Sequence, residues 1–127
     1  MNQELHLDES TMIVSETDTK GNIIYANSDF CTIAGFTKDE LIGKPHNLVR
    51  HKDMPRAAFQ GLWETVKSGK TWNGRVKNIT KDGDYYWVDA TVYKVTKTNG
   101  EERYISVRSK PSREQIEIAI ELYKTLL

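Results

Sequence analysis

The strand-like run 72–80 carries the side chain that best fits ligand binding. Side chains alternate along a strand, so one face of this run holds apolar or small groups and a single amide, Asn78. The charged Arg75 and Lys77 take the other face, as solvent-facing residues do. An amide both donates and accepts hydrogen bonds, so Asn78 suits a ligand edge that presents N–H and C=O groups. The alternative is a core amide bonded to the backbone.

Trp72 and Gly74 share the predicted face of Asn78. Trp72 could stack on or beside a planar ligand, or it could be an ordinary core aromatic. Gly74 lacks a Cβ and would let a planar ring approach the backbone closely.

Three ionisable side chains, Arg50, His51 and Asp53, fall in residues 46–55, which show no periodicity and are predicted to be irregular. A guanidinium can hold a pyrophosphate through paired hydrogen bonds, an imidazole can hydrogen-bond or stack, and Asp53 could orient either. The alternative is a surface ion pair between Arg50 and Asp53, which would contribute little energy.

Asn27 and Phe59 are further candidates with ordinary structural alternatives. Asn27 precedes a helical segment and could cap it. Phe59 lies on the apolar stripe of a helix predicted at 56–68. Either side chain could instead line a cavity.

Turn and cap signals predict the elements that position these residues. Lys81-Asp82-Gly83 and Thr98-Asn99-Gly100 indicate hairpins. Strands are predicted at 11–17, 23–26, 72–80, 85–97 and 103–110, and helices at 27–34, 37–41, 56–68 and after Ser112. The fold class is therefore α+β: a five-stranded antiparallel sheet with grouped helices on one face, and a ligand site between the two layers.

The chain divides into an extended or helical N-terminal arm (1–10), a central domain (11–110) and a C-terminal helix (111–127). That helix carries a coiled-coil-like apolar seam formed by Ile116, Ile120, Tyr123 and Leu127. Tyr85, Trp87 and Tyr93 are predicted on the outer face of the sheet, where the arm, the last helix or a second protomer must cover them.

Composition narrows the function. The 127 residues suit one domain, and 18 basic residues balance 18 acidic ones, which argues against a nucleic-acid binder. The lone Cys31 excludes an internal disulfide. The sequence has no signal peptide, no membrane segment, no metal-ligand cluster and no catalytic constellation. We expect a cytoplasmic non-enzyme, whether or not a longer parent protein is membrane-anchored.

The pattern resembles the PAS domain family across residues 11–110. The motifs are T-D-x-x-G-x-I-x-Y-A-N at 17–27, G-F-T at 35–37, E-L-I-G at 40–43 and K-D-G-x-x-Y-W-V at 81–88. The run H-N-L-V-R-H-K-D-M-P at 46–55, followed by Ala57-Ala58-Phe59 and Trp63, is similar to the FAD-binding PAS domain of bacterial aerotaxis receptors.

This resemblance implies FAD, in preference to FMN, held by Asn78, Trp72 and the 50–53 run, with Asn27 and Phe59 allowed in the cavity. It implies a sensor of oxygen through redox state. Reduction would make Asn78 re-form its hydrogen bonds and alter the arm or last helix, which hands the state to a chemotaxis-type module.

Three alternatives are weighed. A light sensor of the LOV type needs a thiol in the irregular segment, and 46–55 has no cysteine. A haem sensor needs an axial ligand such as histidine, and none lies on the helix at 56–68. A cofactor-free dimerisation module would use the apolar seam and outer aromatic residues for self-association.

Overall fold

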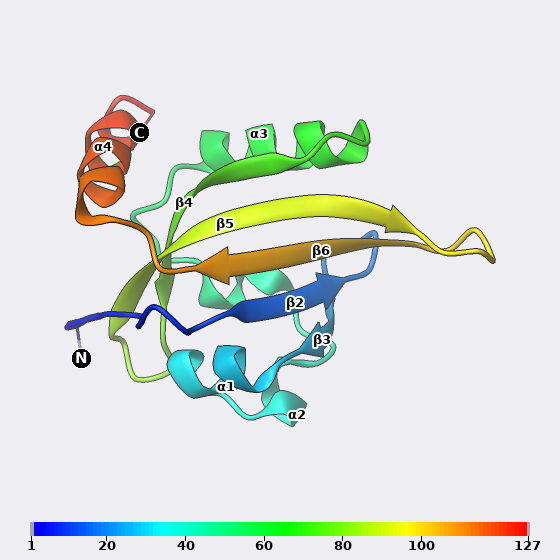
Figure 1. Ribbon diagram of the computed structural model, residues 1–127, viewed down its shortest axis with the longest axis horizontal. Helices are drawn as coiled ribbons and strands as arrows, with labels where there is room; N and C mark the ends of the chain where they lie inside the picture. Colours follow the sequence, from blue (N-terminus) through cyan, green and yellow to red (C-terminus); the bar gives the residue numbers. More distant parts are fainter. Residues whose placement is uncertain (1, 127) are drawn as a thin grey trace.

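The computed structural model describes residues 2–126, and an antiparallel sheet forms its centre (Figure 1). Its five main strands lie in the order β4-β5-β6-β2-β3, and each pair of neighbours is antiparallel. The predicted sheet is therefore confirmed. The strands are β2 (Ile13–Thr17), β3 (Ile23–Ala26), β4 (Trp72–Ile79), β5 (Tyr85–Thr96) and β6 (Glu102–Ser109).

The N-terminal arm adds a short sixth strand, β1 (Glu4–Leu5), which runs parallel to β5. β1 pairs with Tyr85 and Tyr86 at the start of β5. The pairing of β5 with β6 begins only later, at Asp89. The arm is therefore extended, and the sheet is mixed.

Four helical segments connect β3 to β4 and cover the inner face of the sheet. Asn27 caps α1 by accepting from the Phe30 N–H, and Thr37 opens α2 with a capping box. Leu62 and Val66 are the buried residues of α3, at the i, i+4 spacing of an apolar stripe. The segments are α1 (Ser28–Ala34), α2 (Lys38–Leu41), the 3-10 helix η1 (His46–Val49) and α3 (Arg56–Lys67).

The C-terminal helix α4 (Arg113–Lys124) packs on the outer face of the sheet. Ile116 and Ala119 bury Trp87, and the Tyr123 ring stacks on Trp87 with 6.4 Å between ring centroids. The Tyr123 hydroxyl donates to the backbone carbonyl of Arg75. The predicted seam thus packs against the chain's own sheet; Leu127, its last member, lies outside the described residues.

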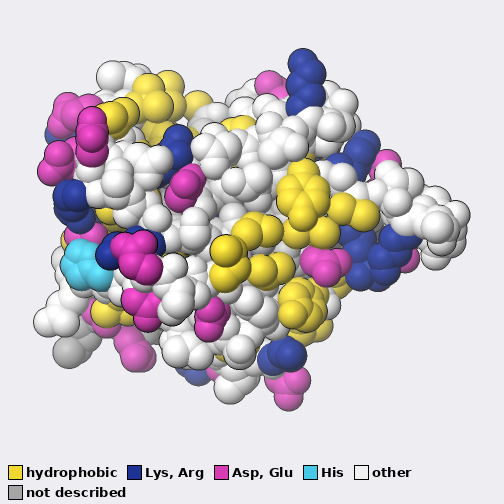
Figure 2. Space-filling view, in the orientation of Figure 1, with side chains coloured by type: hydrophobic (Ala, Val, Ile, Leu, Met, Phe, Trp, Pro, Cys, Tyr) yellow, Lys and Arg dark blue, Asp and Glu magenta, His cyan; other side chains and the backbone are white. Residues whose placement is uncertain are grey.

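The rest of the outer face is less covered. Hydrophobic side chains gather over β2 and β6 in Figure 2, where Val14, Ile105 and Val107 are partly exposed. Of the three predicted outer aromatic residues, Trp87 is buried, while Tyr85 and Tyr93 are partly exposed. Within residues 2–126, no helix has the length and apolar character to cross a membrane.

Candidate functional site

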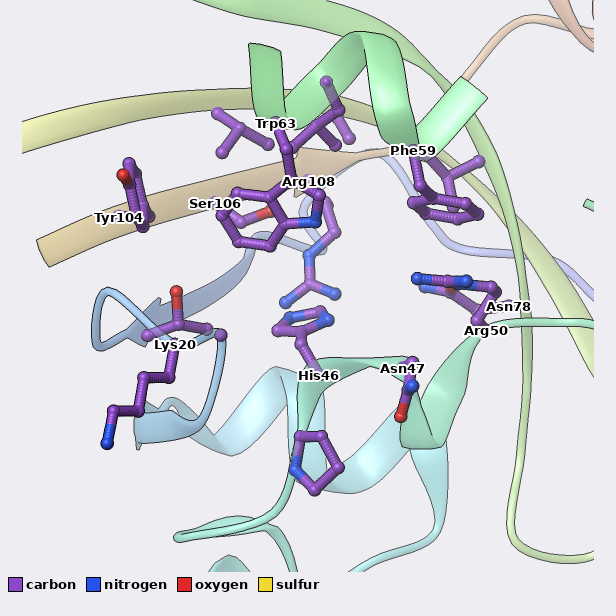
Figure 3. Close-up of a pocket in the computed structure, with 17 residues that line it drawn as sticks. Lys20, His46, Asn47, Arg50, Phe59, Trp63, Asn78, Tyr104, Ser106 and Arg108 are labelled. Atoms are coloured by element: carbon purple, nitrogen blue, oxygen red, sulfur yellow. The ribbon is translucent and has the colours of Figure 1, made fainter. Parts of the chain in front are cut away.

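A cavity of about 190 Å³ lies between the inner face of the sheet and the segment formed by η1 and α3 (Figure 3). Its floor comes from β4, β5 and β6, and aromatic rings of Phe59, Trp63 and Tyr104 stand in its walls. The other lining residues are Thr17, Lys20, Gly21, Pro45, His46, Asn47, Arg50, Leu62, Val76, Asn78, Ala90, Val92, Ser106 and Arg108.

Asn78 occupies the floor, as predicted. The side chains of β4 alternate, so Val76 and Asn78 are buried while Lys77 between them is partly exposed. Asn78 lies opposite Tyr86 of β5. Burial raises the pKa of the Tyr86 phenol, so this neighbour of Asn78 is neutral, although it does not itself line the cavity.

Arg108 is the second polar group of the floor, and it is 2% exposed. Its Nη2 donates to Ser15 Oγ at 2.7 Å, and its guanidinium lies over the Phe30 ring, 4.4 Å from the centroid. Nε and Nη1 have no hydrogen-bond partner in the described chain. Burial lowers the Arg108 pKa to about 10, so the side chain stays cationic at neutral pH.

His46 also lines the cavity, and its imidazole lies next to the Arg108 guanidinium (Figure 3). Its Nε2 lies 3.0 Å from Ser15 Oγ. Since that oxygen accepts from Arg108, its own proton can be donated to an unprotonated Nε2. Burial, followed by the charge of Arg108, lowers the His46 pKa to about 3, so the imidazole is neutral.

Arg50 lines the cavity, whereas its neighbours in the predicted run do not. Its guanidinium lies 3.8 Å from the centroid of the Phe59 ring, and its Nε is buried without a partner. Burial and then the charge of Arg56 lower its pKa. The structure thus brings Arg50, Phe59 and Asn78 together. The backbones of Arg50 and Asn78 form an isolated antiparallel β-bridge.

His51 and Asp53 instead fix the loop to β4. His51 donates its backbone N–H to the Lys77 carbonyl, and its Nδ1 accepts from the Asp53 N–H. Asp53 pairs with Lys77 at 2.9 Å, which lowers its pKa. The considered Arg50–Asp53 pair is therefore replaced by a pair between Asp53 and Lys77.

Trp72, Gly74 and Asn27 also lie outside the cavity lining. Trp72 folds over Gly74, so that a Cβ at Gly74 would lie 2.5 Å from the indole. Gly74 does admit a ring close to the backbone, but the ring is that of Trp72. Asn27 uses its amide locally, because it accepts from the Val14 and Phe30 N–H groups and donates to the Met12 carbonyl.

The residue pattern of β6 does not by itself assign its inner face. The structure turns Tyr104, Ser106 and Arg108 inward, and it also adds Lys20 and Trp63 to the lining. The available signal was an arginine in the strand that ends up in the middle of the sheet, since β6 lies between β5 and β2 and leaves such a side chain little solvent.

The charge of the cavity has one sign. Arg50 and Arg108 supply cationic groups, whereas Lys20 lines the cavity but points its side chain away from it (Figure 3). No Asp or Glu belongs to the lining found among the described residues. The site therefore favours a ligand with acceptor oxygens or negative charge, flanked by aromatic surface. Nowhere in residues 2–126 do three or more His, Cys, Asp or Glu side chains form a possible metal site.

The strand order, the helices between β3 and β4 and the cavity under α3 define a PAS fold. The profile of the PAS fold family matches residues 23–114, so the chain belongs to this family and is a PAS sensor domain. The dark structure of the blue-light photoreceptor Aureochrome1 LOV superposes with a TM-score of 0.75 at 20% identity, over 89% of this chain and 85% of that one.

Among sequence relatives, the aerotaxis receptor of Escherichia coli is 42% identical over 98% of this chain. A biofilm dispersion protein of Pseudomonas aeruginosa is 37% identical over 67% of the chain, and a nitrogen fixation regulatory protein of Klebsiella oxytoca is 31% identical over 80%. The chain spans only 24%, 20% and 21% of these relatives' lengths.

Proposed function

We propose that this domain binds a flavin, specifically FAD, in the cavity and reports redox state to a downstream signalling module. The observation that carries the proposal is the donor set: the guanidinium groups of Arg50 and Arg108 and the amide of Asn78 lie between aromatic walls, and no carboxylate is among the described residues that line the cavity. A flavin nucleotide matches it, because it joins a planar ring with N–H and C=O groups to a pyrophosphate.

The chain's own residues divide this work. Asn78 can donate to one ring atom and accept from another, and it can reverse these roles by turning its amide. Arg50 and Phe59 already stack on each other and offer one flat surface. Lys20 is exposed at the mouth, where phosphates would remain in contact with water.

The cavity must widen before it can hold a flavin ring. About 190 Å³ is below the roughly 300–1,000 Å³ of typical ligand pockets. Trp63 is only partly buried and packs edge-on against Tyr104 at 5.2 Å. We expect Trp63 and Lys20 to move outward when a ring enters.

Redox sensing is preferred to light sensing for a chemical reason. Residues 46–55 contain no cysteine, and Cys31, on α1, is not part of the cavity lining. A bound flavin would supply an electron-accepting ring that gains charge and a proton on reduction. The similarity to an aerotaxis receptor supports the same assignment.

The direct test is the visible spectrum of the purified chain, followed by extraction and mass determination of the cofactor. We expect a yellow protein that releases FAD, or a colourless one that becomes yellow on reconstitution. Protein that stays colourless with FAD would refute the proposal, and a Soret band would indicate haem. Asn78→Ala should weaken FAD retention, whereas Asn73→Ala, on the outer face of the same strand, should not.

The outer face favours a second candidate, a cofactor-free self-association module. Val14, Ile105 and Val107 are partly exposed on β2 and β6, and Ile118 and Leu122 of α4 are more than half exposed. Light scattering after gel filtration separates the two: a dimer that holds no flavin and takes up none would favour this candidate.

A further inference from the structure

Arg108 is held in the core in a way that packing alone does not explain. Two of its three guanidinium nitrogens lack partners, and it has no carboxylate partner among residues 2–126. Its contacts are a neutral hydroxyl of Ser15 and the face of Phe30. The contact with Phe30 is a cation–π contact, which compensates part of the charge, but neither partner carries a negative charge. A buried charge without an anionic partner is costly.

Arg108 lines the cavity, although its Nε and Nη1 atoms are covered by protein and have almost no surface exposed to solvent. Ala90 lies beside it on β5 and lines the same cavity. In Figure 3 the guanidinium extends from β6 into the cavity toward His46. His46 is neutral and offers no negative charge. The nearby Tyr86 hydroxyl favours the charged form of Arg108, but it too is buried without a hydrogen-bond partner. An acceptor that enters the cavity could therefore pair with the unpaired nitrogens after a small rotation of the guanidinium.

We propose that Arg108 is the ring-binding arginine of this site: its free N–H groups receive an acceptor oxygen or developing negative charge of the flavin ring at the cavity floor. This inference rests on the proposed function. It assigns the ring to Arg108 because Arg108 is 2% exposed at the floor, whereas the exposed Lys20 marks the mouth, where the phosphates remain.

If this assignment is correct, replacing Arg108 should raise the stability of the flavin-free protein and lower its affinity for flavin. In flavin-free protein, Arg108→Met replaces an uncompensated charge by an apolar chain of similar reach, so the melting temperature should rise by roughly 5 °C. In the same variant the ring loses a charged donor, so flavin affinity should fall about 10- to 100-fold. A purely structural arginine would lower stability when replaced.

The experiment compares wild type, Arg108→Met, Lys20→Met and Arg103→Met by thermal unfolding and by fluorescence titration. Arg103 is the matched control, because it lies on β6 but faces outward, where it pairs with Glu16 and Glu101. Riboflavin and FAD are both titrated, because riboflavin carries the ring without phosphate.

The inference predicts that Arg108→Met weakens riboflavin and FAD by the same factor and stabilises flavin-free protein. Lys20→Met should weaken FAD alone, and Arg103→Met should leave both affinities unchanged. A loss confined to FAD would assign Arg108 to phosphate and overturn the inference, as would unchanged affinity or a lowered melting temperature. If wild type itself takes up neither flavin, the proposed function fails, and the inference fails with it.

Discussion

His46 is held neutral in the cavity wall, and this should make the domain less stable at mildly acidic pH. Burial and the charge of Arg108 lower its pKa from 6.5 to about 3. Above pH 6.5 the imidazole is neutral in both the folded and the unfolded chain, so it causes no pH dependence. Below pH 6.5 only the unfolded chain takes up the proton, which favours unfolding.

The size of this effect follows from the pKa difference. Each pH unit between 6.5 and 3 costs about 1.4 kcal/mol, which gives about 2 kcal/mol at pH 5. His46 as a whole residue is partly exposed, so solvent screening reduces the expected loss to about 1–2 kcal/mol. Arg50 also faces this ring and opposes its protonation.

The variant that isolates the effect is His46→Gln, whose amide oxygen can still accept from Ser15. Urea unfolding at pH 7.5 and pH 5 should show that wild type loses about 1–2 kcal/mol more than the variant. His51, whose pKa is also lowered, contributes equally to both proteins and cancels. His6→Gln is the control, since that side chain is 69% exposed. Equal losses in wild type and His46→Gln would refute the reasoning.

Three further substitutions test the packing around the site. Gly74→Ala should lower the free energy of unfolding by about 1–3 kcal/mol, because the new Cβ would lie 2.5 Å from the Trp72 indole. Gly61→Ala should stabilise α3 by about 0.5–1 kcal/mol, because a Cβ at Gly61 would have no atom within 4 Å. Denaturant unfolding measures both changes. Tyr123→Phe removes the hydrogen bond to the Arg75 carbonyl and should cost about 0.5–1.5 kcal/mol. Faster proteolysis of α4 in native buffer would accompany it, and wild-type proteolysis and stability would contradict this role.

The main strands were predictable because their signals are local. The turns that end at Gly83 and Gly100 need positive φ, and both glycines have it at 91° and 88°. β1 was not predicted as a strand, because two residues show no alternation and their partner, β5, lies some eighty residues away. Pairing across that distance is set by tertiary structure.

The site was only partly predictable, for two physical reasons. Strand β6 places polar groups inward and leaves Ile105 and Val107 partly exposed, so the usual rule of apolar residues inside misses Arg108. A polar cavity reverses that rule locally. The alternation of side chains along β4 predicted the correct face for Trp72. Alternation does not show where along the strand the cavity ends, so it could not show that Trp72 lies outside the cavity.

The free edge of β4 connects the site to the C-terminal helix. In the sheet, β4 pairs only with β5, so its other edge is open to other partners. The loop after η1 takes part of this edge, where His51 donates to the Lys77 carbonyl and the Lys77 N–H meets Met54 Sδ at 3.4 Å. Two residues earlier on the same strand, the Arg75 carbonyl accepts from Tyr123 of α4. An edge strand presents N–H and C=O groups that are not paired within the sheet, and here they contact both the loop and α4. We therefore expect a shift of the Arg50 loop to reach α4 through β4.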